Sequence, residues 1–175
     1  KSMAVFGTGV IGLELGQALK RLGMEVYHFG RSRRVSGLTD PEINEYAVKV
    51  FEDELALEFS KDVKLSEGSN GKIKIEANGK TWEVEKILSG IGRRLNTDKL
   101  GLEKIGVELD SRGLPDFDRS TMQVGDLPIY LTGDINFERT LLHEASDEGK
   151  IAGYNAVRPE NTRFKRRIPF AVTFT

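Results

Sequence analysis

The sequence predicts an α/β protein with a mostly parallel β-sheet and a small antiparallel β-meander. The chain opens on an apolar run, residues 3–6, which breaks at once into a glycine-rich turn and a helical pattern. A second apolar run at 26–29 follows, so residues 3–30 form a βαβ unit with a right-handed crossover. Further along, Asn78-Gly79 separates two alternating apolar runs, which is a strong signal of a β-hairpin.

Local signals support the first helices and strands. Apolar residues recur at helical spacing from Ile11 to Leu22, and Gly23 predicts the end of this helix. His28 lies inside the second strand, and we interpret it as a half-buried side chain bonded to the backbone. Asp40-Pro41 predicts the N-terminus of a second helix. The expected buried face of that helix consists of Ile43, Ala47, Val50 and Phe51.

The later elements are shorter. Alternating apolar residues from 63 to 91, including Ile87 and Leu88, predict the antiparallel meander. Beyond residue 94 the chain is rich in loops until an apolar strand at 129–131. A third helix is expected over 141–156, and a basic, irregular tail follows at 158–167.

Composition excludes several classes of function. The chain has 175 residues, with 26 Lys and Arg against 27 Asp and Glu, no cysteine and two histidines. Without cysteine it forms no disulfide and carries no thiol redox step, and two distant histidines offer little for a metal site or a catalytic triad. No metal site is expected. The near-neutral charge and the short apolar runs argue against nucleic acid and membrane partners, and we expect a cytoplasmic protein.

The strongest motif is Gly7-Thr8-Gly9-Val10-Ile11-Gly12, which follows a strand and opens a helix. In a dinucleotide site the first glycine permits the tight turn, the second admits the pyrophosphate, and the third allows close packing of helix and strand. The helix N-terminus then offers N–H groups to the phosphates. The alternative is that the glycines only make a tight turn. In this context the motif predicts a Rossmann-like, three-layer nucleotide-binding domain.

The end of the second strand indicates which coenzyme is bound. A carboxylate at this position would bind the 2′-hydroxyl of NAD(H), but the sequence has Gly30 there, followed by Arg31 in a basic run at 31–34. A guanidinium group can bind the 2′-phosphate, which favours NADP(H) over NAD(H). The alternatives are a solvated basic loop without a ligand and, from the glycine at position 12, a weak preference for NAD(H).

Four ordered segments carry a family resemblance. Residues 7–16 are similar to the nucleotide-binding turn of a known family, including Glu14 two residues past the third glycine, and residues 87–96 resemble that family's strand ending in Gly-Arg-Arg-Pro-Asn, except that Leu95 replaces the proline. Residues 100–103 and 106–110 continue the match in register, and residues 129–134, followed by 140–145, resemble the second flavin-contacting segment of the same family. Together these segments resemble the pyridine nucleotide-disulfide oxidoreductases, and among them the dihydrolipoamide dehydrogenases, over nearly the whole chain.

The resemblance implies an internal fragment of a homodimeric flavoprotein. Residues 1–94 would form the NAD(P)-binding Rossmann domain, 95–157 the second segment of the FAD-binding domain, and 158–175 a connector to an interface domain. The missing FAD half, with its cysteine pair, and the missing interface domain, with its catalytic histidine, would lie outside this sequence. The parent enzyme would pass electrons between a nicotinamide nucleotide and a dithiol or disulfide through FAD.

The fragment itself is expected to be catalytically silent and to hold no catalytic residue. Two alternatives remain open. A stand-alone nucleotide-binding or sensing module would share the glycine motif without any chemistry. An NADPH-dependent relative resembling mercuric or glutathione reductase would share Arg31.

The resemblance also implies which residues contact the cofactors. Residues 7–12 would bind the pyrophosphate, Gly30 and Arg31 would meet the adenosine ribose, and Gly92 would lie against the bound nucleotide. Glu14 would lie near the nicotinamide and the flavin. Asp134 would bind FAD, and backbone groups of four further residues would face the flavin ring: Thr140, Leu141, Leu142 and His143.

Overall fold

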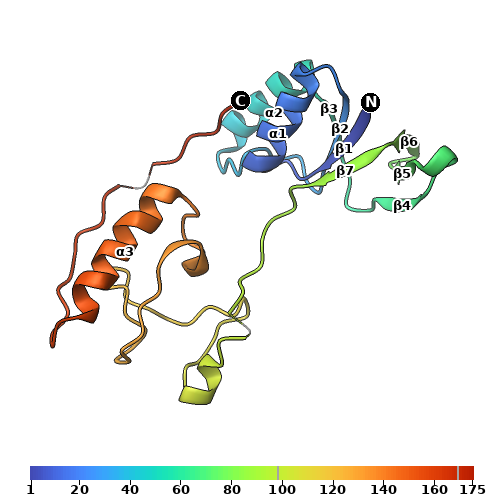
Figure 1. The fold of residues 1–175 in the computed structure, drawn as a ribbon. Coiled ribbons are helices and arrows are strands. Elements are labelled where there is room, and N and C mark those ends of the chain that lie inside the picture. Colours follow the sequence, from blue (N-terminus) through green and yellow to red (C-terminus); the bar gives the residue numbers. More distant parts are fainter. Residues whose placement is uncertain (98, 169) are drawn as a thin grey trace. The chain divides into compact units, whose positions relative to one another are not determined.

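The computed structural model describes residues 1–97, 99–168 and 170–175, so residue 169 of the expected connector lies outside it. The described residues divide into two units (Figure 1). The N-terminal unit comprises Lys1–Gly92 together with Val172–Thr175, and the C-terminal unit comprises Arg93–Ala171.

A four-stranded parallel sheet forms the centre of the N-terminal unit. Its strand order is β3-β2-β1-β7, with β1 (Ser2–Phe6) and β2 (Glu25–Gly30) in the middle and β3 (Ala56–Phe59) and β7 (Lys86–Ser89) at the edges. The sequence pattern placed Ile87 and Leu88 in the meander, which is wrong, because they pair with Ala4 and Val5 of β1. Hydrogen bonds from the Glu85 N–H to Ser2 bring the chain back to this sheet.

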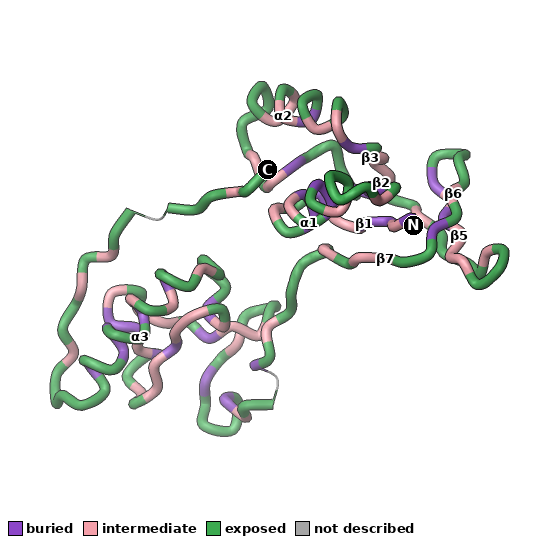
Figure 2. The backbone as a smooth tube through the Cα atoms, turned by 45° about the horizontal axis from the view of Figure 1, so that its top comes forward, coloured by how far each residue is buried: buried purple, intermediate pink, exposed green. Residues whose placement is uncertain are grey.

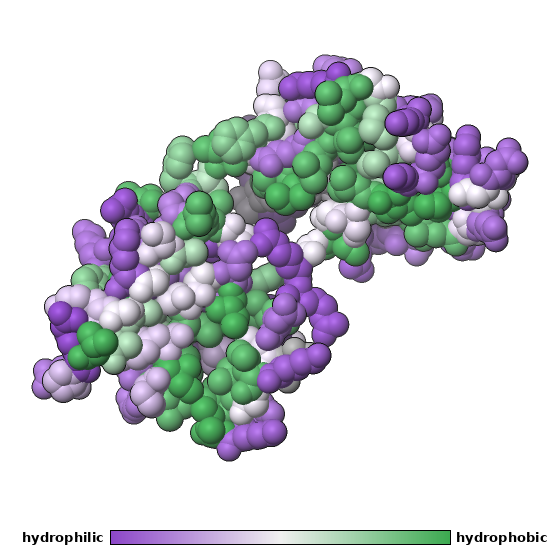
Figure 3. Space-filling model, viewed as in Figure 1, coloured by the Kyte–Doolittle hydropathy of each residue, from purple (hydrophilic) through white to green (hydrophobic). Residues whose placement is uncertain are grey.

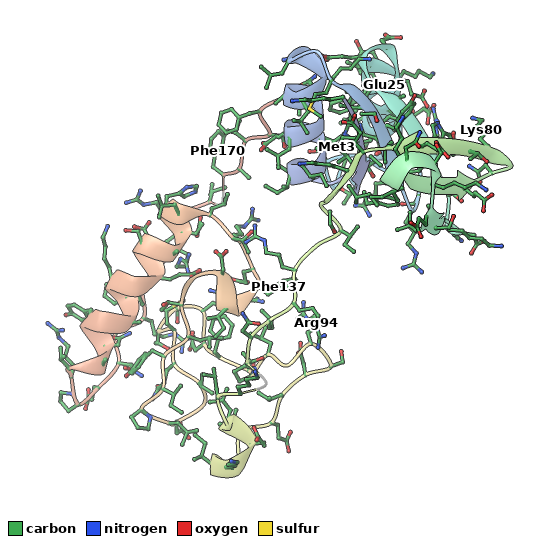
Figure 4. All side chains as sticks on the ribbon, turned by 45° about the vertical axis from the view of Figure 1, so that its right-hand side comes forward. Met3, Glu25, Lys80, Arg94, Phe137 and Phe170 are labelled. Atoms are coloured by element: carbon green, nitrogen blue, oxygen red, sulfur yellow. The ribbon has the colours of Figure 1, made fainter. Side chains whose placement is uncertain are left out.

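The second sheet is antiparallel, with β5 (Ile73–Ala77) between β4 (Lys64–Glu67) and β6 (Lys80–Val84). Asn78 and Gly79 have φ angles of 49° and 75°, so the predicted hairpin turn is confirmed, with both central residues in the left-handed region. Hydrophilic residues predominate on the surface around this sheet in Figure 3, and Figure 4 labels Lys80, the first residue of β6.

Two apolar clusters make the N-terminal unit a three-layer structure. On one face of the parallel sheet, Ala4 and Phe29 pack against Ile75, Ala77 and Val84 of the antiparallel sheet. Helices α1 (Val10–Arg21) and α2 (Pro41–Glu54) cover the other face, where a second cluster is buried: Leu13, Val35, Val48 and Leu55 (Figure 2). The predicted α/β class with a parallel sheet and an antiparallel meander is therefore confirmed.

The helices bury faces that their apolar spacing did not predict. In α1 the buried residues are Gly12, Leu13, Gly16 and Gln17, whereas Ile11, Leu15 and Leu22 are exposed. In α2, Ala47 and Phe51 pack into the core as expected, but Ile43 and Val50 are exposed and Val48 is fully buried. The glycines explain the orientation of α1, because a helix face without side chains approaches a sheet most closely.

The C-terminal unit has little regular structure apart from α3 (Leu142–Ala156), which confirms the helix expected over 141–156. Two short 3-10 helices precede it, η2 (Leu102–Ile105) and η3 (Gly133–Asn136). The strand expected over 129–131 is wrong, because among the described residues this segment is paired only through an isolated bridge from Tyr130 to Gln123. This segment is extended and packs through buried Leu131 into a small apolar cluster with Leu102, Val107 and Val124.

A buried carboxylate organises the C-terminal unit. Glu148, on α3, is 1% exposed, and its Oε2 accepts hydrogen bonds of 2.6 Å from the Gly133 N–H and from the Asn136 side-chain amide. Its Oε1 pairs with the Arg166 guanidinium at 3.2 Å, and Arg166 also pairs with Glu144 at 2.5 Å. This cluster ties α3 both to η3 and to the segment that follows the helix.

Candidate functional site

The candidate site lies at the carboxyl ends of the four parallel strands. A cavity of about 630 Å³ is lined by the loop that follows each strand. These loops contribute Gly7 to Gly9 after β1, Arg31 and Ser32 after β2, Ser60 and Lys61 after β3, and Gly90 to Gly92 after β7. Open α/β sheets bind ligands in the crevice at this edge.

The three glycines of the motif have different structural roles. Gly7 has a φ of +109°, and a Cβ there would overlap the carbonyl oxygen of Gly90. A Cβ on the buried Gly12 would overlap the carbonyl oxygen of Gly7. Gly9 differs from both, because its φ of −75° and ψ of 177° suit any residue and no atom lies within 4 Å of a Cβ built on it. The chain's own packing therefore does not require a glycine at position 9.

The glycine turn leads directly into the N-terminus of α1. The helix begins at Val10, Gly9 provides no side-chain cap, and the first helical bond runs from the Leu13 N–H to the Gly9 carbonyl. The preceding N–H groups, those of Val10, Ile11 and Gly12, have no acceptor within the helix. Helix N-termini of this kind bind phosphate groups. Thr8 fixes the turn, since its hydroxyl donates to the Arg34 carbonyl at 2.7 Å.

The basic run at 31–34 is divided between the cavity and the protein itself. Arg31 lines the cavity. Arg33 instead donates to Glu52 and Glu45 of α2 at 2.6–3.3 Å, and these bonds raise its pKa. Arg34 donates to the carbonyl oxygens of Leu38 and Gly37. Of the three arginines, only Arg31 lines the candidate site.

The sequence pattern missed β3 and with it Ser60 and Lys61. A signal was present, because Leu55, Leu57 and Phe59 alternate immediately after α2. Glu58 is the polar member of this alternation, and in the structure its carboxylate accepts a 2.5 Å hydrogen bond from the side-chain amide of Asn78, in the turn between β5 and β6.

Glu14 lies on α1 and does not line the cavity. Its carboxylate accepts a 2.8 Å hydrogen bond from the N–H of Phe174 in the last residues of the chain. The hydroxyl groups of Ser36 and Thr173 lie 3.0 Å apart in the same contact. The carboxylate therefore has a partner within the N-terminal unit.

The residues assigned to FAD lie in the C-terminal unit. Asp134, on η3, forms an ion pair of 2.6 Å with Arg93. Leu142 and His143 occupy the exposed first turn of α3, and Thr140 and Leu141 precede it. A cavity of about 480 Å³ in this unit is lined by Arg93, Arg94 and Phe137 among others, and Figure 4 labels the last two.

His28 lies beneath the glycine turn, facing α1. Its imidazole is fully buried rather than half-buried as the sequence suggested, and a Cβ on Gly16 would overlap the ring. Nε2 lies 3.1 Å from the Gly12 carbonyl oxygen, so Nε2 carries the proton and donates it, which confirms the expected backbone bond. Nδ1 is buried and has no hydrogen-bond partner among the described residues. Burial lowers the pKa of His28, and the bond to Gly12 only partly opposes this effect.

We expect the N-terminal unit to lose stability as the pH falls below about 6.5, the ordinary pKa of histidine. Below that pH the unfolded chain binds a proton that folded His28 does not, so the free energy of unfolding decreases by at most about 1.4 kcal/mol per pH unit. The loss ends once the pH falls below the lowered pKa of the folded state. Urea unfolding followed by the fluorescence of Trp82, the only tryptophan, measures this effect.

The two histidines supply a matched control. His28→Gln should remove the pH dependence just below about pH 6.5, the ordinary pKa of histidine, whatever its own stability. His143→Gln, at an exposed site in the C-terminal unit, should leave that dependence unchanged. An unchanged slope in His28→Gln would contradict the expectation.

Two further features of the structure concern metal ions and membranes. In the part of the chain that it describes, no group of three metal-ligating side chains could hold an ion. Within those same residues, no helix is long and apolar enough to cross a membrane.

Comparison with known proteins finds similar chains. The model of the family described as pyridine nucleotide-disulphide oxidoreductase matches residues 1–149. Dihydrolipoyl dehydrogenase from Chlamydia trachomatis is 36% identical over 157 residues, 89% of this chain and 33% of that protein. Mercuric reductase from Bacillus cereus is 33% identical over 181 residues, 99% of this chain and 28% of that protein. The chain thus spans about a third of the length of these curated relatives.

Solved structures share the fold. LpdA from Mycobacterium tuberculosis superposes with a TM-score of 0.79 at 26% identity, over 99% of this chain and 38% of its own. An engineered water-forming NADPH oxidase, described as bound to NADPH, superposes with a TM-score of 0.76 at 24% identity, over 94% of this chain and 38% of its own.

Proposed function

Because the chain belongs to the pyridine nucleotide-disulphide oxidoreductase family, as its sequence resemblance predicted, we propose that it is the nucleotide-binding portion of a homodimeric, flavin-dependent oxidoreductase. Residues 1–94 would bind NADP(H), and residues 95–157 would supply one wall of a flavin site. The parent enzyme would resemble dihydrolipoyl dehydrogenase and act on a dithiol or disulfide. A mercuric-reductase-like parent is the second candidate, because such a relative aligns with 99% of this chain.

The observation that carries nucleotide binding is the glycine at position 9. Gly7 and Gly12 are explained by contacts within the protein, but Gly9 has an ordinary backbone conformation and open space around it. The second glycine of a dinucleotide motif lets the pyrophosphate approach the backbone, which is a reason that the packing of this chain does not supply. This favours a binding site over a turn alone.

The ribose end of the cavity supports NADP(H) as the coenzyme. Gly30 brings no carboxylate that would repel a 2′-phosphate, and Arg31 lines the cavity next to it. The engineered oxidase described as bound to NADPH has an arginine introduced directly after an aspartate that was replaced by alanine. Gly30 and Arg31 likewise pair a small residue with an arginine.

The nicotinamide nucleotide, when bound, carries the hydride, whereas this chain binds and orients it. The N–H groups at the start of α1 would hold the pyrophosphate, and Arg31 would bind the ribose phosphate. On the flavin side, Asp134 would offer its carboxylate to FAD. Asp134 would then either release Arg93 or bind Arg93 and FAD at the same time.

We expect the unmodified chain to bind NADPH in calorimetry and Gly9→Ala to lower this affinity roughly ten- to hundredfold, because overpacking costs about 1–3 kcal/mol. The free energy of unfolding should fall by about 1 kcal/mol or less, the difference between glycine and alanine at a helix N-cap. Gly149→Ala, with equally open space in α3, is the control and should bind normally. Equal NADPH affinity in Gly9→Ala would refute the proposed role of this glycine.

A further inference from the structure

A phosphate bound at the ribose end of the cavity, beside Gly30, needs cations that do not already form ion pairs or hydrogen bonds within the protein. Arg33 forms ion pairs with Glu45 and Glu52, and its guanidinium lies over the Phe59 ring, 5.6 Å from the centroid. Arg34 is bonded to two backbone carbonyls. The cavity lining contains neither of them and includes only two basic side chains, Arg31 and Lys61.

Lys61 comes from the loop after β3, and hydrogen bonds hold this loop beside the end of β2. The Ser60 N–H donates to the Gly30 carbonyl at 2.8 Å. The Ser60 hydroxyl donates to the Asp62 carbonyl at 3.1 Å and accepts from the Asp62 N–H at 3.2 Å. Lys61, between them, is therefore presented on a fixed turn next to Arg31.

The acidic residues closest to Lys61 in the sequence do not line this cavity. Asp62 lines a different cavity together with Lys64 and Glu76. Glu58 pairs with Lys80 at 2.8 Å. Among the described residues, no ion pair joins Arg31 or Lys61 to a carboxylate. Two cationic side chains thus face one cavity with their charges uncompensated.

The space that an acidic side chain at position 30 would need is already occupied by other side chains. A Cβ on Gly30 would lie 2.8 Å from the Phe59 ring and 2.9 Å from the Thr8 methyl group. Phe59 directly precedes Ser60 and Lys61, so one short segment both blocks the acidic position and supplies a cation. A dianionic phosphate satisfies both cations, whereas a ribose hydroxyl does not.

We propose that Lys61 is the second specificity-determining residue for NADP(H), binding the 2′-phosphate together with Arg31 while Arg33 and Arg34 take no part. This assignment rests on the proposed function, and it names a contact that the basic run at 31–34 does not contain. Lysine acts here as a point charge and Arg31 as a planar donor, so the two groups can bind different phosphate oxygens.

Calorimetry with NADPH, NADH and adenosine 2′,5′-bisphosphate tests the assignment. Lys61→Gln should weaken the binding of NADPH and of the bisphosphate roughly three- to tenfold and leave the binding of NADH unchanged. A loss of this size lies between the contribution of an exposed ion pair and that of a charge-assisted hydrogen bond. The loss should shrink at high salt. Lys61→Arg should restore most of the affinity. Lys64→Gln removes the same charge from β4, outside the cavity, and should have little effect, as should Arg33→Gln.

The outcomes separate this assignment from the proposed function. If the unmodified chain prefers NADPH and Lys61→Gln keeps the full preference, Lys61 is not a determinant although the proposed function stands. If Arg33→Gln or Lys64→Gln lowers the preference as much as Lys61→Gln, the effect is one of general charge, and the assignment is again overturned. If the unmodified chain binds neither dinucleotide, both the assignment and the proposed function fail.

Discussion

Replacing Arg31 by alanine is expected to remove most of a ten- to hundredfold preference for NADPH over NADH. Arg31 lines the cavity at the end of β2, and a charge-assisted hydrogen bond contributes about 1.5–3 kcal/mol. NADH lacks the 2′-phosphate, so its affinity should hardly change. Titration calorimetry of both nucleotides at low and high salt measures the preference and its screening.

Arg34→Ala is the matched control for this experiment. Its guanidinium is bonded to the carbonyl oxygens of Leu38 and Gly37, so its loss should leave the ratio of NADPH to NADH affinity unchanged. Equal binding of NADH and NADPH by the unmodified chain would show that Arg31 makes no contact with a 2′-phosphate. A simple reversal by Gly30→Glu is not expected, because the new side chain must first displace Phe59 and Thr8.

Replacing Glu148 by alanine is expected to be the most damaging change to the C-terminal unit, with a loss of about 3–5 kcal/mol. The substitution leaves the Gly133 N–H and the Asn136 amide without their acceptor. It also deprives Arg166 of one of its two carboxylate partners in a poorly solvated position. A buried polar group that loses its hydrogen-bond partner destabilises the folded state by more than the intact hydrogen bond stabilised it.

Hydrogen exchange of the α3 amides measures this loss, because α3 carries Glu148. The fluorescence of Trp82, in β6 of the N-terminal unit, reports separately on the other unit and should change little. Glu160→Ala, at an exposed position after α3, is the control and should cost within about 0.5 kcal/mol. A similarly small effect of Glu148→Ala would show that the cluster does not hold the unit together.

Features that depend on neighbouring residues could be predicted from the sequence. The βαβ unit at the N-terminus, the Asp40 cap, the Asn78-Gly79 turn and α3 are each fixed by local backbone preferences, and the structure has all of them. The glycine motif was recognisable for the same reason, because its spacing reports directly on a turn and a helix start.

Features that depend on distant residues were predicted poorly. The pairing of β7 with β1 follows from contacts across most of the N-terminal unit, and the buried face of α1 follows from His28 packing on Gly16. The segment 129–131 has the composition of a strand but has only one bridging partner, and strands form only where partners exist.

Three features of the candidate site can be seen in the sequence: a glycine turn of the nucleotide-binding type, no carboxylate at the end of β2, and a run of arginines after it. Which cations line the cavity depends on the fold, because α2 and the loop after residue 34 engage Arg33 and Arg34 while β3 brings Lys61 to the cavity. An ion pair depends on distance in space, and folding brings residues that are far apart in the chain to one edge of the sheet.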